Sequence, residues 1–202
     1  MTKKTEIQKA YCRTQSTYEK LGAQYDADRS KVLFEKPWLS RFESLIPDKS
    51  DILDVGCGGG EPIARFFIEK GHSITGIDYA SSMVEIASKR FPKHHWHVLD
   101  MRDFSLERQF DGIISWHSFF HLAPHEQNKT LERFAQHLKP GGALIITVGP
   151  DTGEVIGKVG GESVYHSSLS QNEYRNILNE NNMDVIDFTI EDPQCDFASI
   201  IL

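Results

Sequence analysis

The sequence has few cysteines, no long hydrophobic run and no concentration of basic residues. Its three cysteines, Cys12, Cys57 and Cys195, lie too far apart for a disulfide framework or a zinc site, and this favours a reducing, cytoplasmic location. No apolar run approaches the roughly 18 residues of a membrane span. The polar N-terminus lacks the apolar segment of a signal peptide. We therefore expect no membrane partner.

The lysines and arginines are scattered, and the net charge is −7. Because phosphate contacts dominate affinity for nucleic acids, an acidic chain without a basic stripe argues against a nucleic-acid partner. At 202 residues the chain is long enough for one domain with a complete core. These properties favour a small molecule or a protein as the partner, and they do not indicate an oligomeric state.

Apolar segments alternate with helical patterns after a helical N-terminal region, which predicts a parallel sheet with helices on both faces. The five glycines within 149–168 predict a mobile or ligand-covering loop. The sequence ends inside an apolar strand, so we expect a few further residues. Strands are expected at 51–55, 73–77, 96–99, 110–115, 143–148, 185–190 and 197–202, and helices within 5–46, from 61 to about 70, from an N-cap at 81 to about 91, and at 124–138 and 170–182.

A glycine-dense turn directly after the first strand is the most informative segment. It reads Asp54-Val55-Gly56-Cys57-Gly58-Gly59-Gly60, with glycines in the pattern G-x-G-x-G. A dinucleotide-binding fingerprint, G-x-G-x-x-G, would need glycine at the position of Glu61. Glycine permits positive φ and leaves no Cβ to hold a ligand away. A ligand is therefore expected against bare backbone, at the positive end of the helix that follows.

Acidic or polar residues close the next three strands as well. Asp78 ends the second strand, Asp100 with Met101 ends the third, and Ser115-Trp116-His117 ends the fourth. In open α/β sheets, ligands bind outside the carboxyl ends of the strands, where the strand order reverses. A carboxylate at position 78 could accept both hydroxyls of a ribose, which would suit NAD equally well.

Together these features resemble the motifs of class I S-adenosylmethionine-dependent methyltransferases, of the type 11/25 small-molecule kind. The resemblance covers about residues 18–202 and includes the turn at 138–144 and the aromatic segment at 18–26. It implies a doubly wound α/β fold with a seven-stranded, mostly parallel, Rossmann-like sheet in the order 3-2-1-4-5-7-6, the last strand antiparallel. It also implies a single domain over 1–202, with a helical cap at 1–47 and a glycine-rich substrate-side loop at 149–168.

The implied cofactor is S-adenosylmethionine, with S-adenosylhomocysteine as product. By resemblance, the carboxylate of Asp100 receives the exocyclic amine of adenine, Met101 contacts the ring, and Tyr25 contacts the methionine end. The full set of expected cofactor-binding residues is Tyr25, Asp54, Gly56, Cys57, Gly58, Asp78, Tyr79, Met83, Asp100, Met101, Ser115 and Trp116.

Two histidines after the fourth strand, His117 and His121, are the candidates for a general base. Histidine titrates near neutrality, and a spacing of four places both on one face of a turn. A base is needed only if the acceptor must lose a proton. A packing or capping role for His121 stays open, as does a plain substrate contact for His117.

Expected substrate-binding residues are Tyr18, Tyr165 and His166, each of which could equally be structural. No metal is expected. His95 and His97 would share one face of a strand, but a third ligand is lacking, so an exposed strand entry is the simpler interpretation.

The function that follows is methyl transfer from S-adenosylmethionine to a small molecule, with oxygen, nitrogen, sulfur or carbon as the acceptor atom. Two alternatives remain. One is an NAD-dependent oxidoreductase, which Glu61 in the glycine motif disfavours. The other is a catalytically silent, regulatory protein that binds S-adenosylmethionine.

Overall fold

A central seven-stranded sheet organises the computed structural model, which describes residues 3–202; residues 1 and 2 of the expected domain lie outside it. The sheet order is β3-β2-β1-β4-β5-β9-β8, which confirms the expected topology. Strand β9 runs antiparallel to both of its neighbours, and the remaining pairs are parallel. The strands are β1 (Asp51–Val55), β2 (Ser73–Asp78), β3 (His95–Val98), β4 (Phe110–Ser115), β5 (Leu138–Val148), β8 (Phe188–Asp192) and β9 (Ala198–Ile201).

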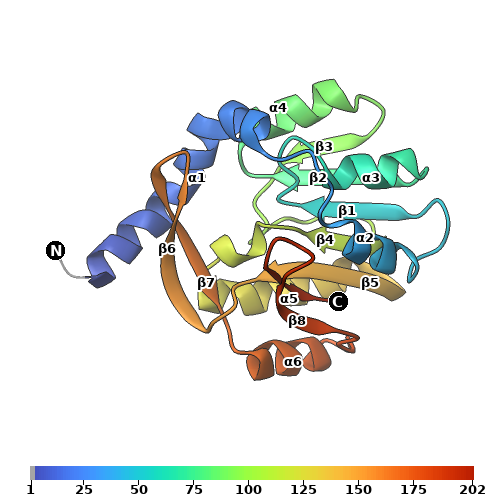
Figure 1. The fold of residues 1–202 in the computed structure, drawn as a ribbon. Helices are drawn as coiled ribbons and strands as arrows, with labels where there is room; N and C mark the ends of the chain where they lie inside the picture. Colours follow the sequence, from blue (N-terminus) through green and yellow to red (C-terminus); the bar gives the residue numbers. More distant parts are fainter. Residues whose placement is uncertain (1–2) are drawn as a thin grey trace.

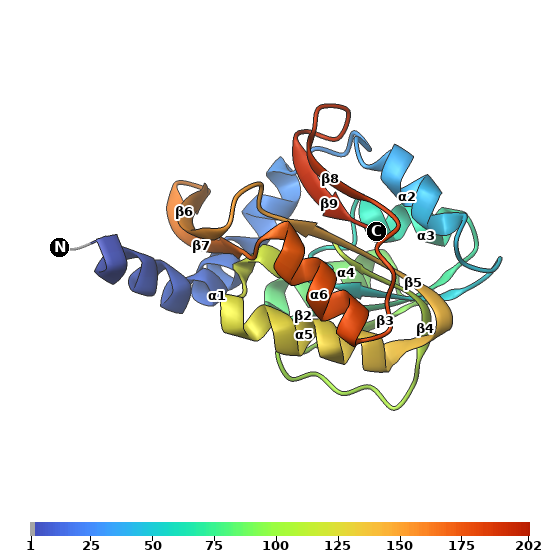
Figure 2. The same cartoon turned by 90° about the horizontal axis from the view of Figure 1, so that it is seen from below.

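Helices cover both faces of this sheet, with α2 and α3 on one side and α5 and α6 on the other (Figure 2). Alternation along β1 supplies both layers, because Ile52 packs against one set of helices and Leu53 and Val55 against the other. The helices are α1 (Lys3–Asp28), α2 (Lys36–Glu43), α3 (Ile63–Glu69), α4 (Ser81–Arg90), α5 (Pro124–His137) and α6 (Gln171–Glu180), with a short 3₁₀ turn, η1, at Phe119–His121.

Residues 149–168 are not the loop that the glycine content predicts. They contain an antiparallel hairpin of β6 (Gly153–Val159) and β7 (Glu162–Ser168). A Cβ at Gly157 would lie 2.5 Å from the ring of His166, so this glycine permits close packing between the two strands. Figure 1 shows the hairpin beside α1, at the end of the sheet where β1 and β4 finish.

Several expected boundaries were also wrong. Helix α3 begins at Ile63 with Pro62 as its N-cap, and Ala80 rather than Ser81 is the N-cap of α4. Residues 140–142, expected as a turn, lie within β5, where a register shift between Phe110 and Gly112 of the paired strand accommodates them. Strand β8 begins at residue 188 rather than 185, whereas the capping box that opens α6 at residue 170 is confirmed.

The expected helical cap at 1–47 consists of two unlike parts. Helix α2 buries Trp38, Leu39 and Phe42 in the core against the sheet. Helix α1 instead packs against the β6–β7 hairpin and α4. We call α1 and the β6–β7 hairpin the α1–hairpin layer. The division into a domain and its cap stays a prediction.

Candidate functional site

A cavity lies between α1 and the carboxyl ends of the central strands, and we call it the inner cavity. Its lining brings together fourteen of the predicted site residues. Ser115 is not among them, because its hydroxyl points at the backbone and donates to the carbonyl of Val55. The predicted residues that do line the inner cavity are Tyr18, Tyr25, Asp54, Gly56, Cys57, Gly58, Asp78, Tyr79, Met83, Asp100, Met101, Trp116, His117 and His121.

The glycine turn is held open toward the inner cavity. Gly58 has a φ of +52°, and a Cβ built there would meet nothing within 4 Å. The carboxylate of Asp78 fixes the turn by accepting the backbone N–H of Gly58 at 3.0 Å and that of Ala80 at 2.9 Å. Burial raises the pKa of Asp78 to about 6. The turn is therefore a preformed backbone cradle with free space above it.

Two ionic side chains at the inner cavity, the buried Asp54 and the partly buried Arg29, each have a polar atom without a hydrogen-bond partner. Asp54 is 3% exposed, and its Oδ2 has no hydrogen-bond partner. Burial, and then the charge of Asp78, raise the pKa of Asp54 to about 7. The guanidinium of Arg29 contacts Glu35 and Tyr25, each at 3.3 Å, while its Nε is unpartnered. The carboxylate of Asp54 and the guanidinium of Arg29 are complementary to the ammonium and carboxylate groups of an amino-acid zwitterion.

Tyr18 and His121 form a hydrogen-bonded pair beside this cavity. The Nδ1 of His121 lies 2.7 Å from the carbonyl oxygen of Tyr165, so Nδ1 carries the proton and donates it. Nε2 is then an acceptor, and it receives the hydroxyl of Tyr18 at 2.9 Å. Burial lowers the pKa of His121 to about 3 and raises that of Tyr18. Tyr18 therefore donates to His121 while its phenolic oxygen keeps a free lone pair.

A second cavity, the outer cavity, lies between the hairpin and the end of β5 and has a volume of about 390 Å³. It shares Tyr18, Tyr25 and His117 with the inner cavity. His117 has a φ of +52°, and its backbone N–H donates to Thr147. Burial lowers its pKa to about 4. Of the two candidates on β7, His166 lines the outer cavity, whereas the side chain of Tyr165 lies behind it with its hydroxyl on Glu154.

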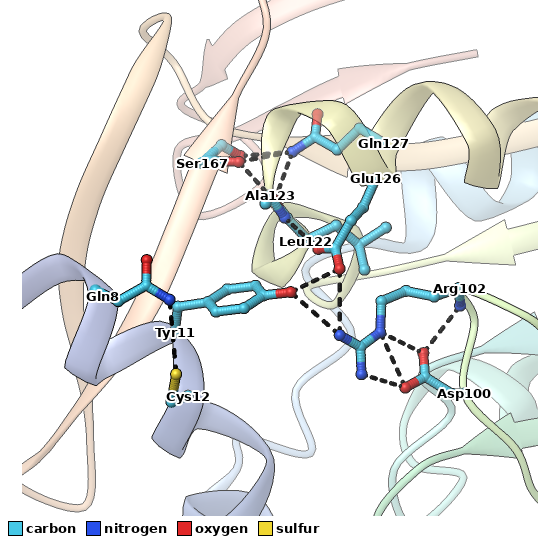
Figure 3. A network of polar contacts seen from close by, with 10 residues as sticks. All are labelled: Gln8, Tyr11, Cys12, Asp100, Arg102, Leu122, Ala123, Glu126, Gln127 and Ser167. Carbon is cyan, nitrogen blue, oxygen red and sulfur yellow. Dashed lines mark hydrogen bonds and ion pairs between the residues drawn. The ribbon is translucent and has the colours of Figure 1, made fainter.

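An ion-pair network beside Asp100 involves residues that were not predicted from the sequence (Figure 3). Arg102 donates from Nε to both carboxylate oxygens of Asp100, at 2.9 and 3.0 Å. Its Nη1 lies 3.2 Å from Glu126, which accepts the hydroxyl of Tyr11 at 2.6 Å. The carboxylate expected to receive the adenine amine is thus already shared with a guanidinium. The sequence signal that could have predicted this ion pair is Arg102, two residues after the aspartate that ends the strand.

Helix α1 is also tied to the glycine turn. The guanidinium of Arg90, at the end of α4, donates to both carboxylate oxygens of Asp26 and to the carbonyl of Gly59. Glu19 accepts the backbone N–H of Ser81 at 2.6 Å, and so takes over the capping role that Ala80 cannot fill. We call the α1–hairpin layer the roof of the inner cavity and the glycine turn its floor. Helix α1 therefore joins the roof both to the floor and to α4.

Within residues 3–202, no group of three or more histidine, cysteine or acidic residues is arranged to hold a metal ion. His95 and His97 are exposed on β3. None of the described helices combines the length and the apolar character needed to cross a bilayer.

Comparison with protein families matches residues 52–142 to a methyltransferase domain. A dTDP-3-amino-3,4,6-trideoxy-α-D-glucopyranose N,N-dimethyltransferase of Streptomyces venezuelae is 35% identical over 51% of this chain and 44% of its own length. A ubiquinone biosynthesis O-methyltransferase of Bartonella tribocorum is 29% identical over 71% of this chain and 64% of that protein. The chain spans less than half of the first three curated relatives.

Solved structures agree on the fold. An amino pentose methyltransferase from Micromonospora echinaspora, with S-adenosylmethionine bound, aligns with a TM-score of 0.69 at 17% identity, over 89% of this chain and 94% of that one. A 1,6-didemethyltoxoflavin-N1-methyltransferase from Burkholderia thailandensis aligns with a TM-score of 0.71 at 18% identity, over 95% and 85%. Residues 52–142 thus match a methyltransferase domain, and the chain shares the fold of these solved methyltransferases.

Proposed function

We propose that this protein transfers a methyl group from S-adenosylmethionine to a small molecule. The observation that carries the proposal is the unpartnered Oδ2 of buried Asp54, opposite Arg29 and beside the open cradle at Gly58. Asp54 would hold the ammonium of the methionine moiety and Arg29 its carboxylate. Asp78, whose oxygens each accept one backbone N–H, keeps lone pairs for the ribose hydroxyls.

When bound, the cofactor supplies an activated methyl group on a sulfonium, so the chain's own task is to position the acceptor and to manage one proton. Tyr18 lines both cavities, and its phenolic oxygen, while donating to His121, would accept an N–H or O–H from the acceptor. His117, at the boundary of the two cavities, orients the acceptor as a neutral imidazole. The α1–hairpin layer excludes water from the transfer step.

The adenine end needs a modified assignment. Because Arg102 occupies both oxygens of Asp100, the purine amine would share that carboxylate with the guanidinium. Met101 is buried and lines the inner cavity, which suits contact with the ring. The proposal also includes a cytoplasmic location and no nucleic-acid partner, on the acidic charge and the free cysteines.

Thermal unfolding with S-adenosylmethionine, S-adenosylhomocysteine and NAD in parallel tests the cofactor. Ligand at about 100 times its Kd adds about 2.7 kcal/mol to the free energy of unfolding. For a chain of this size, this raises the Tm by roughly 5–10 °C. We expect this rise with the two adenosyl ligands and none with NAD. A rise with NAD alone would replace the proposal with an oxidoreductase, and binding without turnover on any acceptor would favour a regulatory protein.

The protonation of Asp54 gives the assignment a pH signature. With a pKa of about 7, Asp54 becomes neutral as the pH falls below 7 and then no longer attracts an ammonium. The Kd of S-adenosylhomocysteine should therefore rise about tenfold between pH 8 and pH 6, by proton linkage. Calorimetry across this range measures it. Asp54→Asn should bind weakly at both pH values, and a variant that retains the wild-type pH profile would place the ammonium elsewhere.

A further inference from the structure

The outer cavity adjoins the inner one, with which it shares Tyr18, Tyr25 and His117, and it is lined mainly by uncharged groups. Aromatic side chains gather where the two cavities meet: Tyr18 and Tyr25 pack edge to face at 5.5 Å between ring centres, and Phe120 packs against His166 at 4.7 Å. At about 390 Å³, the outer cavity is within the range that holds small ligands. If the cofactor occupies the inner cavity as proposed above, the acceptor occupies this one.

The charges around the outer cavity all have one sign. Two carboxylates, Asp151 and Asp196, line it, and no lysine or arginine does among residues 3–202. Lys158 lies on β6 between Gly157 and Val159, and alternation along the strand directs its side chain to the opposite face. Arg29 lines the inner cavity and not the outer one.

The histidines add no positive charge to this balance. Burial lowers the pKa of His117 to about 4 and that of His121 to about 3, and it also lowers the pKa of His166. All three imidazoles are therefore neutral at pH 7. A phosphate or carboxylate group on an acceptor would enter this cavity without a cationic partner and facing two anions, which is unfavourable.

We propose that the outer cavity selects a small amine with an apolar body, so that the methyl acceptor is nitrogen and carries no phosphate or carboxylate. This substrate class rests on the proposed methyl transfer. The two carboxylates attract the ammonium form at the cavity mouth, and the aromatic faces receive the amine. The amine then releases one proton to solvent. Its lone pair forms the bond to the methyl carbon, the carbon–sulfur bonding pair returns to sulfur, and the sulfonium becomes a thioether.

Three probes with the same ring and different charges test the selection: benzylamine, benzoate and benzyl phosphate. Each is titrated into the full-length protein saturated with S-adenosylhomocysteine, at low ionic strength. We expect benzylamine to bind on the order of tenfold more tightly than either anion, through two exposed carboxylates at low ionic strength. With S-adenosylmethionine in place of the product, mass spectrometry should detect N-methylbenzylamine.

Matched variants connect the preference to the cavity. The double variant Asp151→Asn with Asp196→Asn should lose most of the preference for the amine, whereas Asp48→Asn, at the opposite end of the sheet before β1, should keep it. Benzylamine that fails to bind, equal binding of the three probes, or tighter binding of an anion would overturn the amine assignment. Failure of the amine assignment can be distinguished from failure of the proposed function, because a thermal shift with S-adenosylhomocysteine on the same samples tests cofactor binding alone.

Discussion

The glycine turn and the α1–hairpin layer face each other across the inner cavity, but they are held in place differently. Gly56 and Gly58 are positioned by the strand that precedes them and by Asp78 at the end of the neighbouring strand. Tyr18, by contrast, is positioned by His121, more than a hundred residues further along the chain. The matched methyltransferase domain covers 52–142, so it contains the turn and leaves out α1 and both hairpin strands. The segment shared with other methyltransferases thus contains the glycine turn, whereas the α1–hairpin layer lies outside it.

The largest loss of stability should come from adding a Cβ atom in the glycine turn. Gly56→Ala places a Cβ 2.3 Å from Ser118 at a φ of +73°. Gly141→Ala has a similar φ of +76° but open space, so it isolates the backbone strain. We expect a loss of about 3 kcal/mol or more for Gly56→Ala and about 1 kcal/mol for Gly141→Ala in urea unfolding. Equal losses would mean that the close approach at Gly56 is unimportant.

A smaller and more local loss of stability is expected in the α1–hairpin layer. Thr14 of α1 accepts the buried backbone N–H of Tyr165 at 2.9 Å. Thr14→Val keeps the shape and leaves that N–H unpaired, which should cost about 1–3 kcal/mol. Hydrogen exchange should accelerate in 153–168 while the strands of the central sheet stay protected. Ser16→Ala, an exposed change on the same helix, is the control. Uniform acceleration over the whole chain would show that roof and floor unfold together.

The smallest loss of stability is expected where α1 contacts Glu126 and Arg102. Tyr11→Phe removes the hydroxyl that donates to Glu126 and accepts from Arg102. We expect about 1 kcal/mol of lost stability, with faster hydrogen exchange in the first half of α1. Affinity for S-adenosylhomocysteine should fall only a few-fold, since the contacts of Asp54 and Asp78 are untouched. A larger loss of affinity than of stability would place Tyr11 in direct contact with the ligand.

The same division explains what could be predicted from the sequence. Alternating apolar residues, glycines and strand-end aspartates are local signals, and they located β1, β2, β4 and the strand-end residues that line the inner cavity. The hairpin was missed because its glycines are typical of loops, and Gly157 is explained only once the ring of His166 is seen against it. Arg29 and Glu126 were missed because their importance depends on partners that are distant in the chain or that belong to the ligand.

Helix α1 forms the wall that the two cavities share, and this has a consequence for the order of binding. Asp26 is joined through Arg90 to the carbonyl of Gly59, so we expect docking of the helix and occupancy of the turn to be linked, each favouring the other by the same free energy. Tyr18 and Tyr25 complete the outer cavity only while α1 is docked. We therefore expect compulsory-order kinetics, in which the cofactor binds first and the methylated product leaves before S-adenosylhomocysteine.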